Sequence, residues 1–164
     1  MENKATVFKN TAALMAEMNF LIVDKDDSRP WGGFYVIDEA EAAKFAAYFF
    51  PEENLEALKI TGKLSPKILL VAPNKKLSWQ YHHRRAEIWK CIGGTVGVIT
   101  SDTDIEAKQH TLTEGKIIQL KQGERHRLIG LEDWGIVAEI WLHTDASHPS
   151  DEEDIVRVQD DFGR

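Results

Sequence analysis

The amino-acid sequence predicts a mainly β protein, folded as a barrel or a sandwich. From Pro66 onward it consists of short apolar or alternating runs, among them KILLVA, EIWKCI, TVGVIT, KIIQL and IVAEIWLH. Turn-forming segments such as PN, GG, SDTD and KQGE separate these runs, which is typical of strands joined in an all-β fold. Helical patterns of about ten to fifteen residues do not lie between them, which argues against a parallel α/β sheet.

Length and composition favour one domain over residues 1–164. The hydrophobic share is 43% and the charged share 29%, as in ordinary globular proteins. A formal charge of −7 argues against a nucleic-acid partner. We expect a cytoplasmic protein without a membrane partner, because the N-terminus MENKATVFKN lacks an apolar signal core and the sequence lacks a membrane-length apolar run. Cys91 is alone and lies in an apolar run, so we expect it to be buried and inert.

The first third of the sequence predicts an arm, a strand and a helical insert. Residues 1–28 form the arm, in which the run LMAEMNFLIV is compatible with a helix followed by a strand or with one packing segment. WGGFYVID reads as a strand because aromatic and β-branched residues dominate it. The insert covers about residues 38–62. Its apolar residues recur at helical spacing around Pro51, which predicts a stripe that packs on the core: Ala42, Phe45, Ala46, Phe49, Leu55 and Leu58.

The predicted barrel core, about residues 66–143, holds metal-binding residue types in two strand–turn regions. Alternate side chains of a strand share a face, so Gln80 and His82 can both point inward and Glu87 can return on the next strand. His83 should then face away. His126 follows the Gly123 turn and can supply a fourth ligand. This mixed set suits one divalent ion, with zinc first and manganese, iron, cobalt or nickel as alternatives.

These spacings resemble the two motifs of the cupin superfamily, G-x5-H-x-H-x4-E-x6-G and G-x5-P-x-G-x2-H-x3-N. Four positions differ in identity, since Asn74 and Gln80 replace Gly and His, and Lys121 and Gly130 replace Pro and Asn. The resemblance implies a cupin barrel, a jelly-roll or double-stranded β-helix, with an N-terminal arm and a short helical insert. The matched positions are Asn74, Gln80, His82, Glu87 and Gly94 in the first motif, and Gly115, Lys121, Gly123, His126 and Gly130 in the second.

A narrower resemblance is to the C-terminal isomerase domain of type II mannose-6-phosphate isomerases. QYHHRRAEIW is similar to QMHHHRAEHW of that domain, RPWGGFYV to its opening RPWG-x-Y, and EEDIVRVQDDFGR to its closing EDDIVR-x-x-D-x-YGR. The resemblance covers about residues 29–37 and 66–164. We recognise no counterpart of the first 28 residues, of the insert, or of the family's fused nucleotidyltransferase domain, so guanylyltransferase activity is not implied.

The resemblance assigns roles to individual residues. It implies metal ligation by Gln80, His82, Glu87 and His126, and it places Arg85, Arg157 and Arg164 near the sugar phosphate. Arginine suits a phosphate because its planar guanidinium group can donate two hydrogen bonds to the phosphate oxygens at once. Arg84 and Ile88 stand where the family has His.

Glu139 and Arg85 are the expected catalytic residues. Glu139 lies in an apolar strand and matches a family Glu, so burial would raise its pKa and suit it to proton transfer. Pairing of Glu139 with an arginine is the structural alternative.

The expected function is that of a metal-dependent aldose–ketose isomerase acting on a sugar phosphate, with mannose 6-phosphate and fructose 6-phosphate as the first pair. The alternative is a non-catalytic cupin that binds a sugar or sugar phosphate. A metal oxygenase is a third class, although such enzymes more often use two His and one carboxylate. The expected partner is a small sugar phosphate, and a homodimer is left open.

Overall fold

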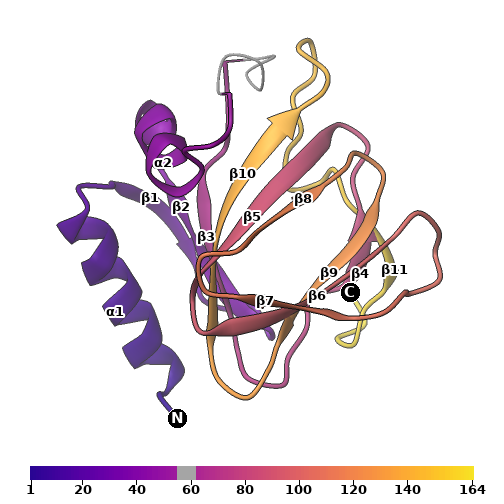
Figure 1. The fold of residues 1–164 in the computed structure, drawn as a ribbon, viewed down its shortest axis with the longest axis horizontal. Helices are drawn as coiled ribbons and strands as arrows, with labels where there is room; N and C mark the ends of the chain where they lie inside the picture. The colour runs from indigo at the N-terminus through magenta and orange to yellow at the C-terminus, as the bar shows by residue number, and fades with distance from the viewer. Residues whose placement is uncertain (55–61) are drawn as a thin grey trace.

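Two antiparallel sheets form the body of the molecule. The computed structural model describes residues 1–54 and 62–164. The order of the first sheet is β1-β2-β3-β10-β5-β8 and that of the second is β11-β4-β9-β6-β7. The sheets face each other as an open barrel, and both helices lie outside the first sheet (Figure 1). The predicted mainly β architecture is confirmed.

The elements follow the expected order along the chain. The helical elements are α1 (Lys4–Glu17), the 3-10 turn η1 (Glu39–Glu41) and α2 (Ala42–Phe49). The strands are β1 (Ile22–Asp26), β2 (Gly32–Ile37), β3 (Lys67–Val71), β4 (Trp79–Tyr81), β5 (Arg85–Gly93), β6 (Thr95–Ser101), β7 (His110–Thr113), β8 (Ile117–Leu120), β9 (Arg125–Gly130), β10 (Gly135–His143) and β11 (Val156–Gln159).

The N-terminal arm is a helix followed by a strand, the first of the two readings given for it. Asn3 caps α1 by accepting a hydrogen bond from the backbone N–H of Thr6. The predicted insert helix is observed as α2, which ends two residues before Pro51. Leu55 and Leu58 of the predicted stripe lie outside the described residues. None of the helices in the described part of the chain has the length and apolar character needed to span a membrane.

The central strands β2, β3 and β10 of the first sheet are buried on both faces, which explains why they read as nearly continuous apolar runs. In β3, Ile68 and Leu70 face outward into a cluster with the residues of α1 and α2, whereas Leu69 and Val71 face into the barrel. Phe45 is fully buried in the outer cluster. Tyr35 also ties the arm to the sheet, because its hydroxyl donates to the Phe8 carbonyl at 2.9 Å. The helices therefore close the back of the sheet and leave the barrel interior for the site.

Candidate functional site

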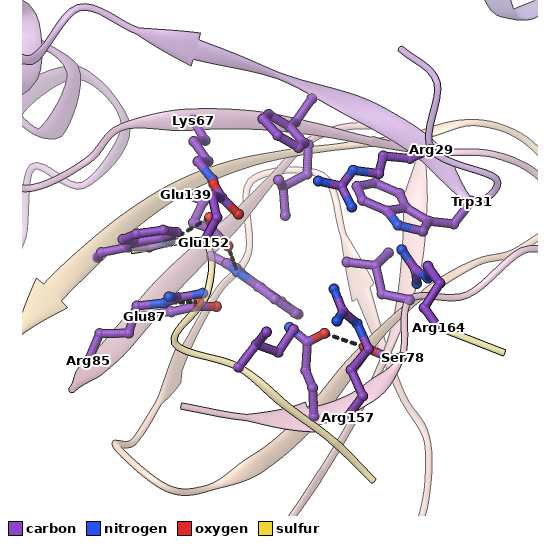
Figure 2. Close-up of a pocket in the computed structure, with 17 residues that line it drawn as sticks. Arg29, Trp31, Lys67, Ser78, Arg85, Glu87, Glu139, Glu152, Arg157 and Arg164 are labelled. Atoms are coloured by element: carbon purple, nitrogen blue, oxygen red, sulfur yellow. Dashed lines mark hydrogen bonds and ion pairs between the residues drawn. The ribbon is translucent and has the colours of Figure 1, made fainter. Parts of the chain in front are cut away.

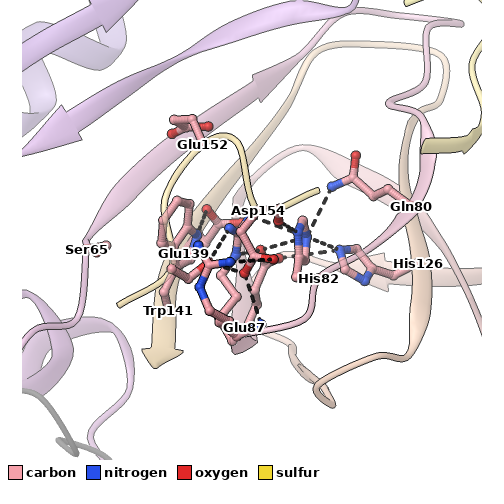
Figure 3. Close-up of polar contacts among 12 residues, drawn as sticks. Ser65, Gln80, His82, Glu87, His126, Glu139, Trp141, Glu152 and Asp154 are labelled. Atoms are coloured by element: carbon pink, nitrogen blue, oxygen red, sulfur yellow. Dashed lines mark hydrogen bonds and ion pairs between the residues drawn. The ribbon is translucent and has the colours of Figure 1, made fainter. Parts of the chain in front are cut away.

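Strands β5 and β9, from different sheets, and the turn after β4 bring three potential metal ligands together. Gln80 of β4 pairs with His126 of β9, His82 follows β4, and Glu87 returns on β5. The Nε2 atom of His82 lies 3.2 Å from Nε2 of His126 and 3.3 Å from Oε1 of Glu87. His126 Nε2 lies 3.5 Å from Glu87 Oε2. His82, Glu87 and His126 are all buried and converge on one point (Figure 3).

Backbone carbonyls determine which ring nitrogens of the two histidines face that point. His82 Nδ1 lies 2.7 Å from the Asp154 carbonyl, and His126 Nδ1 lies 3.0 Å from the Glu124 carbonyl. A carbonyl only accepts, so each Nδ1 carries the hydrogen and each Nε2 presents a lone pair. Burial lowers the pKa of both rings, that of His82 to about 3, and so favours the neutral form. The two opposed lone pairs suit a cation between them.

Glu87 supplies the negative charge of this cluster. Its Oε2 atom is buried and has no hydrogen-bond partner among the described residues. Burial opposes ionisation, but the Arg85 guanidinium, which is charged and donates a hydrogen bond, holds the pKa of Glu87 below its usual range. An ionised, buried carboxylate with an unpaired oxygen beside two imidazole lone pairs is a donor set that fits a borderline divalent metal.

Gln80 lies beside the cluster with its amide turned away from ligation. Its Oε1 accepts from the Ser78 hydroxyl at 2.5 Å, and its Nε2 lies 3.4 Å from His82 Nε2. A half-turn of the amide would exchange these atoms. The Ser78 hydroxyl could then accept from Nε2, and Oε1 would face the metal position. Ligation by Gln80 therefore requires this rotamer, while His82, Glu87 and His126 already point inward.

The Arg85 guanidinium is held on several sides within the protein. Nε donates to Glu87 Oε1 at 2.8 Å, and Nη1 donates to the Ser150 hydroxyl at 2.9 Å and to the Asp151 carbonyl at 3.0 Å. The group also stacks 3.6 Å from the ring centre of Trp141. These contacts favour a role in orienting Glu87. The predicted phosphate contact of Arg85 would require some of them to be exchanged.

Residues 144–155, here called the strap, fasten the end of the chain to the ligand hairpin. The Asp154 carboxylate accepts from the backbone N–H groups of His83 and Arg84, each at 3.0 Å, and from the Ser150 hydroxyl at 2.6 Å. The Asp154 carbonyl orients His82. The strap therefore positions one histidine of the cluster, a role that spacing within the hairpin could not reveal.

The two positions where the resembling family has His have different surroundings. Ile88 is fully buried in the outer cluster beneath the helices, so its side chain points away from the barrel interior. Arg84 lies 3.8 Å from Asp154 and 3.6 Å from Asp151, both in the strap. The prediction that His83 faces away is confirmed, since it is exposed and packs against Tyr81.

Glu139 lies in β10 with its carboxylate fixed by two indoles. Trp89 Nε1 donates to Oε2 at 2.6 Å and Trp141 Nε1 donates to Oε1 at 2.8 Å. Burial, with the charge of Glu87 added to it, raises the pKa of Glu139 to about 7. Among the described residues, this carboxylate thus accepts hydrogen bonds from two tryptophans rather than from an arginine. The group can exist in both protonation states near neutral pH.

One cavity of about 90 Å³ reaches the metal-ligand cluster at Glu87 and also borders Glu139. Glu87 and Glu139 line one part of it, and Arg29, Arg157 and Arg164 line another (Figure 2). Sequence reasoning named Arg157 and Arg164 but missed Arg29, Trp31 and Lys67. Arg29 and Trp31 belong to the RPWG segment, which was the available signal. The lining residues are Arg29, Trp31, Phe34, Lys67, Leu69, Leu77, Ser78, Gln80, Arg85, Glu87, Trp89, Glu139, Trp141, Glu152, Ile155, Arg157 and Arg164.

The three arginines form the positive end of the cavity. Partial burial and the charges of Arg164 and Arg29 lower the pKa of Arg157, so the three groups are close enough to repel one another. Asp26 accepts from Arg29 Nε at 2.8 Å and Asp160 accepts from Arg164 Nε at 2.8 Å. An anion with several acceptor oxygens would relieve this repulsion.

Comparisons with known proteins identify relatives of the chain. The family model described as "Mannose-6-phosphate isomerase C-terminal" matches residues 40–160. A mannose-1-phosphate guanylyltransferase of Klebsiella pneumoniae is 32% identical over 125 residues, which cover 76% of this chain and 25% of that protein. The alginate biosynthesis protein AlgA of Pseudomonas aeruginosa is 29% identical, over 76% of this chain and 24% of its own length. The chain thus spans about a quarter of these relatives.

Solved structures support the fold. CapF of Staphylococcus aureus, a capsular polysaccharide assembling protein, matches with a TM-score of 0.54 and 10% identity, over 85% of this chain and 34% of that chain. A recombinant oxalate oxidase matches with a TM-score of 0.53 and 19% identity, over 81% of this chain and 58% of that chain. The predicted cupin fold is confirmed, and at this identity the likeness concerns the fold alone.

The names of the relatives correct the predicted function. The expected interconversion of mannose 6-phosphate and fructose 6-phosphate is wrong, because the relatives compared above are named for mannose-1-phosphate guanylyl transfer and alginate biosynthesis. The alternative of a non-catalytic sugar-binding cupin is not favoured either, because the relative from Klebsiella pneumoniae and another from Escherichia coli are named as mannose-1-phosphate guanylyltransferases, which are enzymes. The resemblance predicted the domain family correctly, but the name of that family does not determine the reaction of this chain.

Proposed function

Because the chain belongs to the family of mannose-6-phosphate isomerase C-terminal domains, we propose that it is a metal-dependent enzyme domain that binds a mannose phosphate and performs acid–base chemistry on it. The observation that carries the proposal is the layout of the cavity, which joins Glu87 and Glu139 to three arginines (Figure 2). A sugar phosphate has the matching polarity, with hydroxyl groups on the ring and a dianionic group attached to it.

At the end of the cavity near Glu87, the ion would be held by His82, Glu87 and His126. Gln80 would join them after a half-turn of its side-chain amide. Zinc suits this donor set, and manganese, iron, cobalt or nickel are alternatives. A bound divalent ion would supply Lewis acidity toward sugar oxygens. Arg85 fixes the carboxylate of Glu87, and the strap carbonyl of Asp154 fixes the ring of His82. Such outer contacts commonly tune metal affinity.

At the positive end, Arg29, Arg157 and Arg164 would bind the phosphate. Asp26 and Asp160 hold two of these guanidinium groups in place. Each planar guanidinium group can donate charge-assisted hydrogen bonds to phosphate oxygens. Between the two ends, Glu139 would accept a proton from the sugar or return one to it, because a carboxyl group with a pKa of about 7 exists in both forms at neutral pH.

The relatives contribute the class of ligand to this proposal. The relative from Klebsiella pneumoniae is named for mannose 1-phosphate, and the family model for mannose 6-phosphate. Guanylyl transfer is not part of the proposal, since the match covers only about a quarter of those relatives.

Arg157→Ala is expected to weaken the binding of a mannose phosphate by about tenfold to a hundredfold, the equivalent of one charge-assisted contact of about 1.5 to 3 kcal/mol. Calorimetry with metal-loaded protein would compare mannose 1-phosphate, mannose 6-phosphate, mannose and inorganic phosphate. Lys9→Ala, which removes one positive charge from the exposed side of α1, is the matched control and should leave every affinity unchanged. Equal loss for mannose and its phosphates in Arg157→Ala would remove this arginine from the phosphate site.

The same samples test the chemistry. Metal-loaded protein is expected to alter a mannose phosphate detectably by ¹H and ³¹P NMR, and chelation should stop the change. Glu139→Gln keeps the shape of the side chain and removes its basicity, so it should bind the ligand and lose turnover. Binding without chemical change under any metal tried would overturn the enzyme proposal.

A further inference from the structure

We infer that Lys67 is a second proton-carrying residue of this cavity, partnered with Glu139, and that the substrate must displace Glu152 to reach it. The inference rests on the proposed function and adds a residue to it. Lys67 begins β3 and pairs directly with Glu139 in the antiparallel register of β3 and β10. Side chains at directly paired positions lie on the same face of a sheet, about 5 Å apart at Cβ. Both residues line the cavity (Figure 2).

The surroundings of Lys67 form a built site rather than a solvated surface. The residue is only 5% exposed. Its Nζ atom lies 4.5 Å from the ring centres of both Phe34 and Trp141. Lysine is among the side chains least often buried, and an unpaired ammonium in an apolar site is costly. The neighbouring β3 positions Ile68 to Val71 are all apolar, so packing alone does not call for a cation here.

Charges from four neighbouring elements act on this ammonium. Glu139 of β10, Glu87 of β5 and Glu152 of the strap favour the charged form, while Arg85 and Arg29 oppose it. Burial is the largest influence and lowers the pKa of Lys67 to about 8. The amine is therefore poised to give up its proton more readily than a solvent-exposed lysine does.

Glu152 covers Lys67 in a way that a ligand could reverse. Its carboxylate forms an ion pair with Nζ, yet the Glu152 side chain is 55% exposed whereas that of Lys67 is 6% exposed. The strap around it is anchored, because Arg85 binds Ser150 and the Asp151 carbonyl. Rotation of one side chain into solvent would thus free the amine while the strap backbone stays in place.

Glu139 and Lys67 together take up and release equal numbers of protons in the proposed step. The Glu139 carboxylate accepts one proton from the substrate, and the Lys67 ammonium donates one to a substrate oxygen. The pair then consists of a carboxylic acid and a neutral amine. Transfer of one proton from Glu139 to Lys67 restores both groups, and no electron donor or acceptor is needed.

A labelling experiment tests the contact independently of turnover. Erythrose 4-phosphate carries a phosphate for the arginines and an aldehyde that condenses with a neutral amine and loses water, and cyanoborohydride reduces the resulting imine. Mass spectrometry is expected to find the label on Lys67. Labelling should be reduced by mannose 6-phosphate and in Arg157→Ala, and increased in Glu152→Ala. Label spread over surface lysines, with Lys67 unlabelled in both the parent and Glu152→Ala, would overturn the inference.

Kinetics tests the proton transfer itself. Lys67→Met, which keeps an unbranched apolar stem, and Lys67→Arg, which keeps the charge, are both expected to lower kcat by about a hundredfold or more. The alkaline limb of the kcat profile should be absent from Lys67→Arg, because arginine does not deprotonate. Circular dichroism and metal content verify folding, and Lys9→Ala is the control.

The outcomes separate the two proposals. Parent-like kcat and pH profile in Lys67→Arg would reject the proton role of Lys67 and leave the proposed function standing. Protected labelling of Lys67 in a protein that leaves every mannose phosphate unchanged would instead reject the proposed chemistry and support the contact between Lys67 and the ligand.

Discussion

Replacing either His82 or His126 by alanine is expected to lower metal affinity by more than about a hundredfold, the upper end of the loss caused by changes outside the ligand sphere. The two Nε2 atoms lie 3.2 Å apart, with Glu87 within 3.5 Å of both. Removal of one imidazole leaves too few donors to hold the ion. Elemental analysis after zinc loading and dialysis should find about one ion per parent chain and almost none in the variants.

His83→Ala is the matched control for this experiment. His83 adjoins His82 in the sequence but is exposed and lies outside the cluster. It should retain the metal content of the parent. Zinc should also raise the unfolding free energy of the parent, by about 2.7 kcal/mol at a free concentration one hundred times Kd, and should not stabilise the two ligand variants. Undiminished zinc content in His82→Ala and His126→Ala would show that the ion binds elsewhere.

A large loss of stability is expected for Gly130→Ala. A Cβ atom at this position would lie 1.9 Å from the Ala72 carbonyl oxygen and 2.8 Å from its carbon. These are backbone atoms, and the N–H of Gly130 already donates to the Lys75 carbonyl at 2.7 Å. The end of β9 and the backbone at Ala72, just after β3, must therefore move apart. We expect this to lower the free energy of unfolding by about 3 kcal/mol. Urea unfolding of the metal-free protein measures this loss.

Gly93→Ala is the control variant, because it places an alanine in a strand without a clash between its Cβ and backbone atoms. Its nearest contact would be the Ile136 Cδ1 atom at 3.1 Å, the end of a flexible side chain. We expect a change below about 1 kcal/mol. Similar losses in both variants would contradict the role given to the Ala72 carbonyl. The close approach of the Ala72 carbonyl also explains why glycine stands at position 130, where the cupin motif has Asn.

The parts of the site that depend on short-range spacing could be predicted from the sequence. Gln80, His82 and Glu87 lie in one hairpin, so strand alternation was enough to place them together. His126 required the motif spacing. The orientation of the Gln80 amide and the hydrogen bonds of Arg85 could not be predicted, because they depend on Ser78 and on the strap.

The remaining parts depend on long-range register. Lys67 faces Glu139 only because β3 pairs with β10, and the hydrophobic pattern of β3 is equally apolar on both faces. Its periodicity therefore carries no information about which residues face the barrel. Arg29 reaches the cavity from the connection between β1 and β2, far in sequence from Arg157. The reaction is harder to predict from the sequence than the fold is, because cupin domains with the same fold can catalyse different reactions.

The most direct test of the account is the relaxation of the phosphorus nucleus of mannose 6-phosphate, and in parallel of mannose 1-phosphate, in the presence of protein loaded with Mn²⁺. In the proposed site the metal and the phosphate bind at two ends of one small cavity. We therefore expect the Mn²⁺ protein to enhance ³¹P relaxation of a bound mannose phosphate, the zinc protein not to do so, and His82→Ala to abolish the enhancement. Unchanged ³¹P relaxation in a protein that binds both Mn²⁺ and the sugar phosphate would separate the two sites and contradict the account.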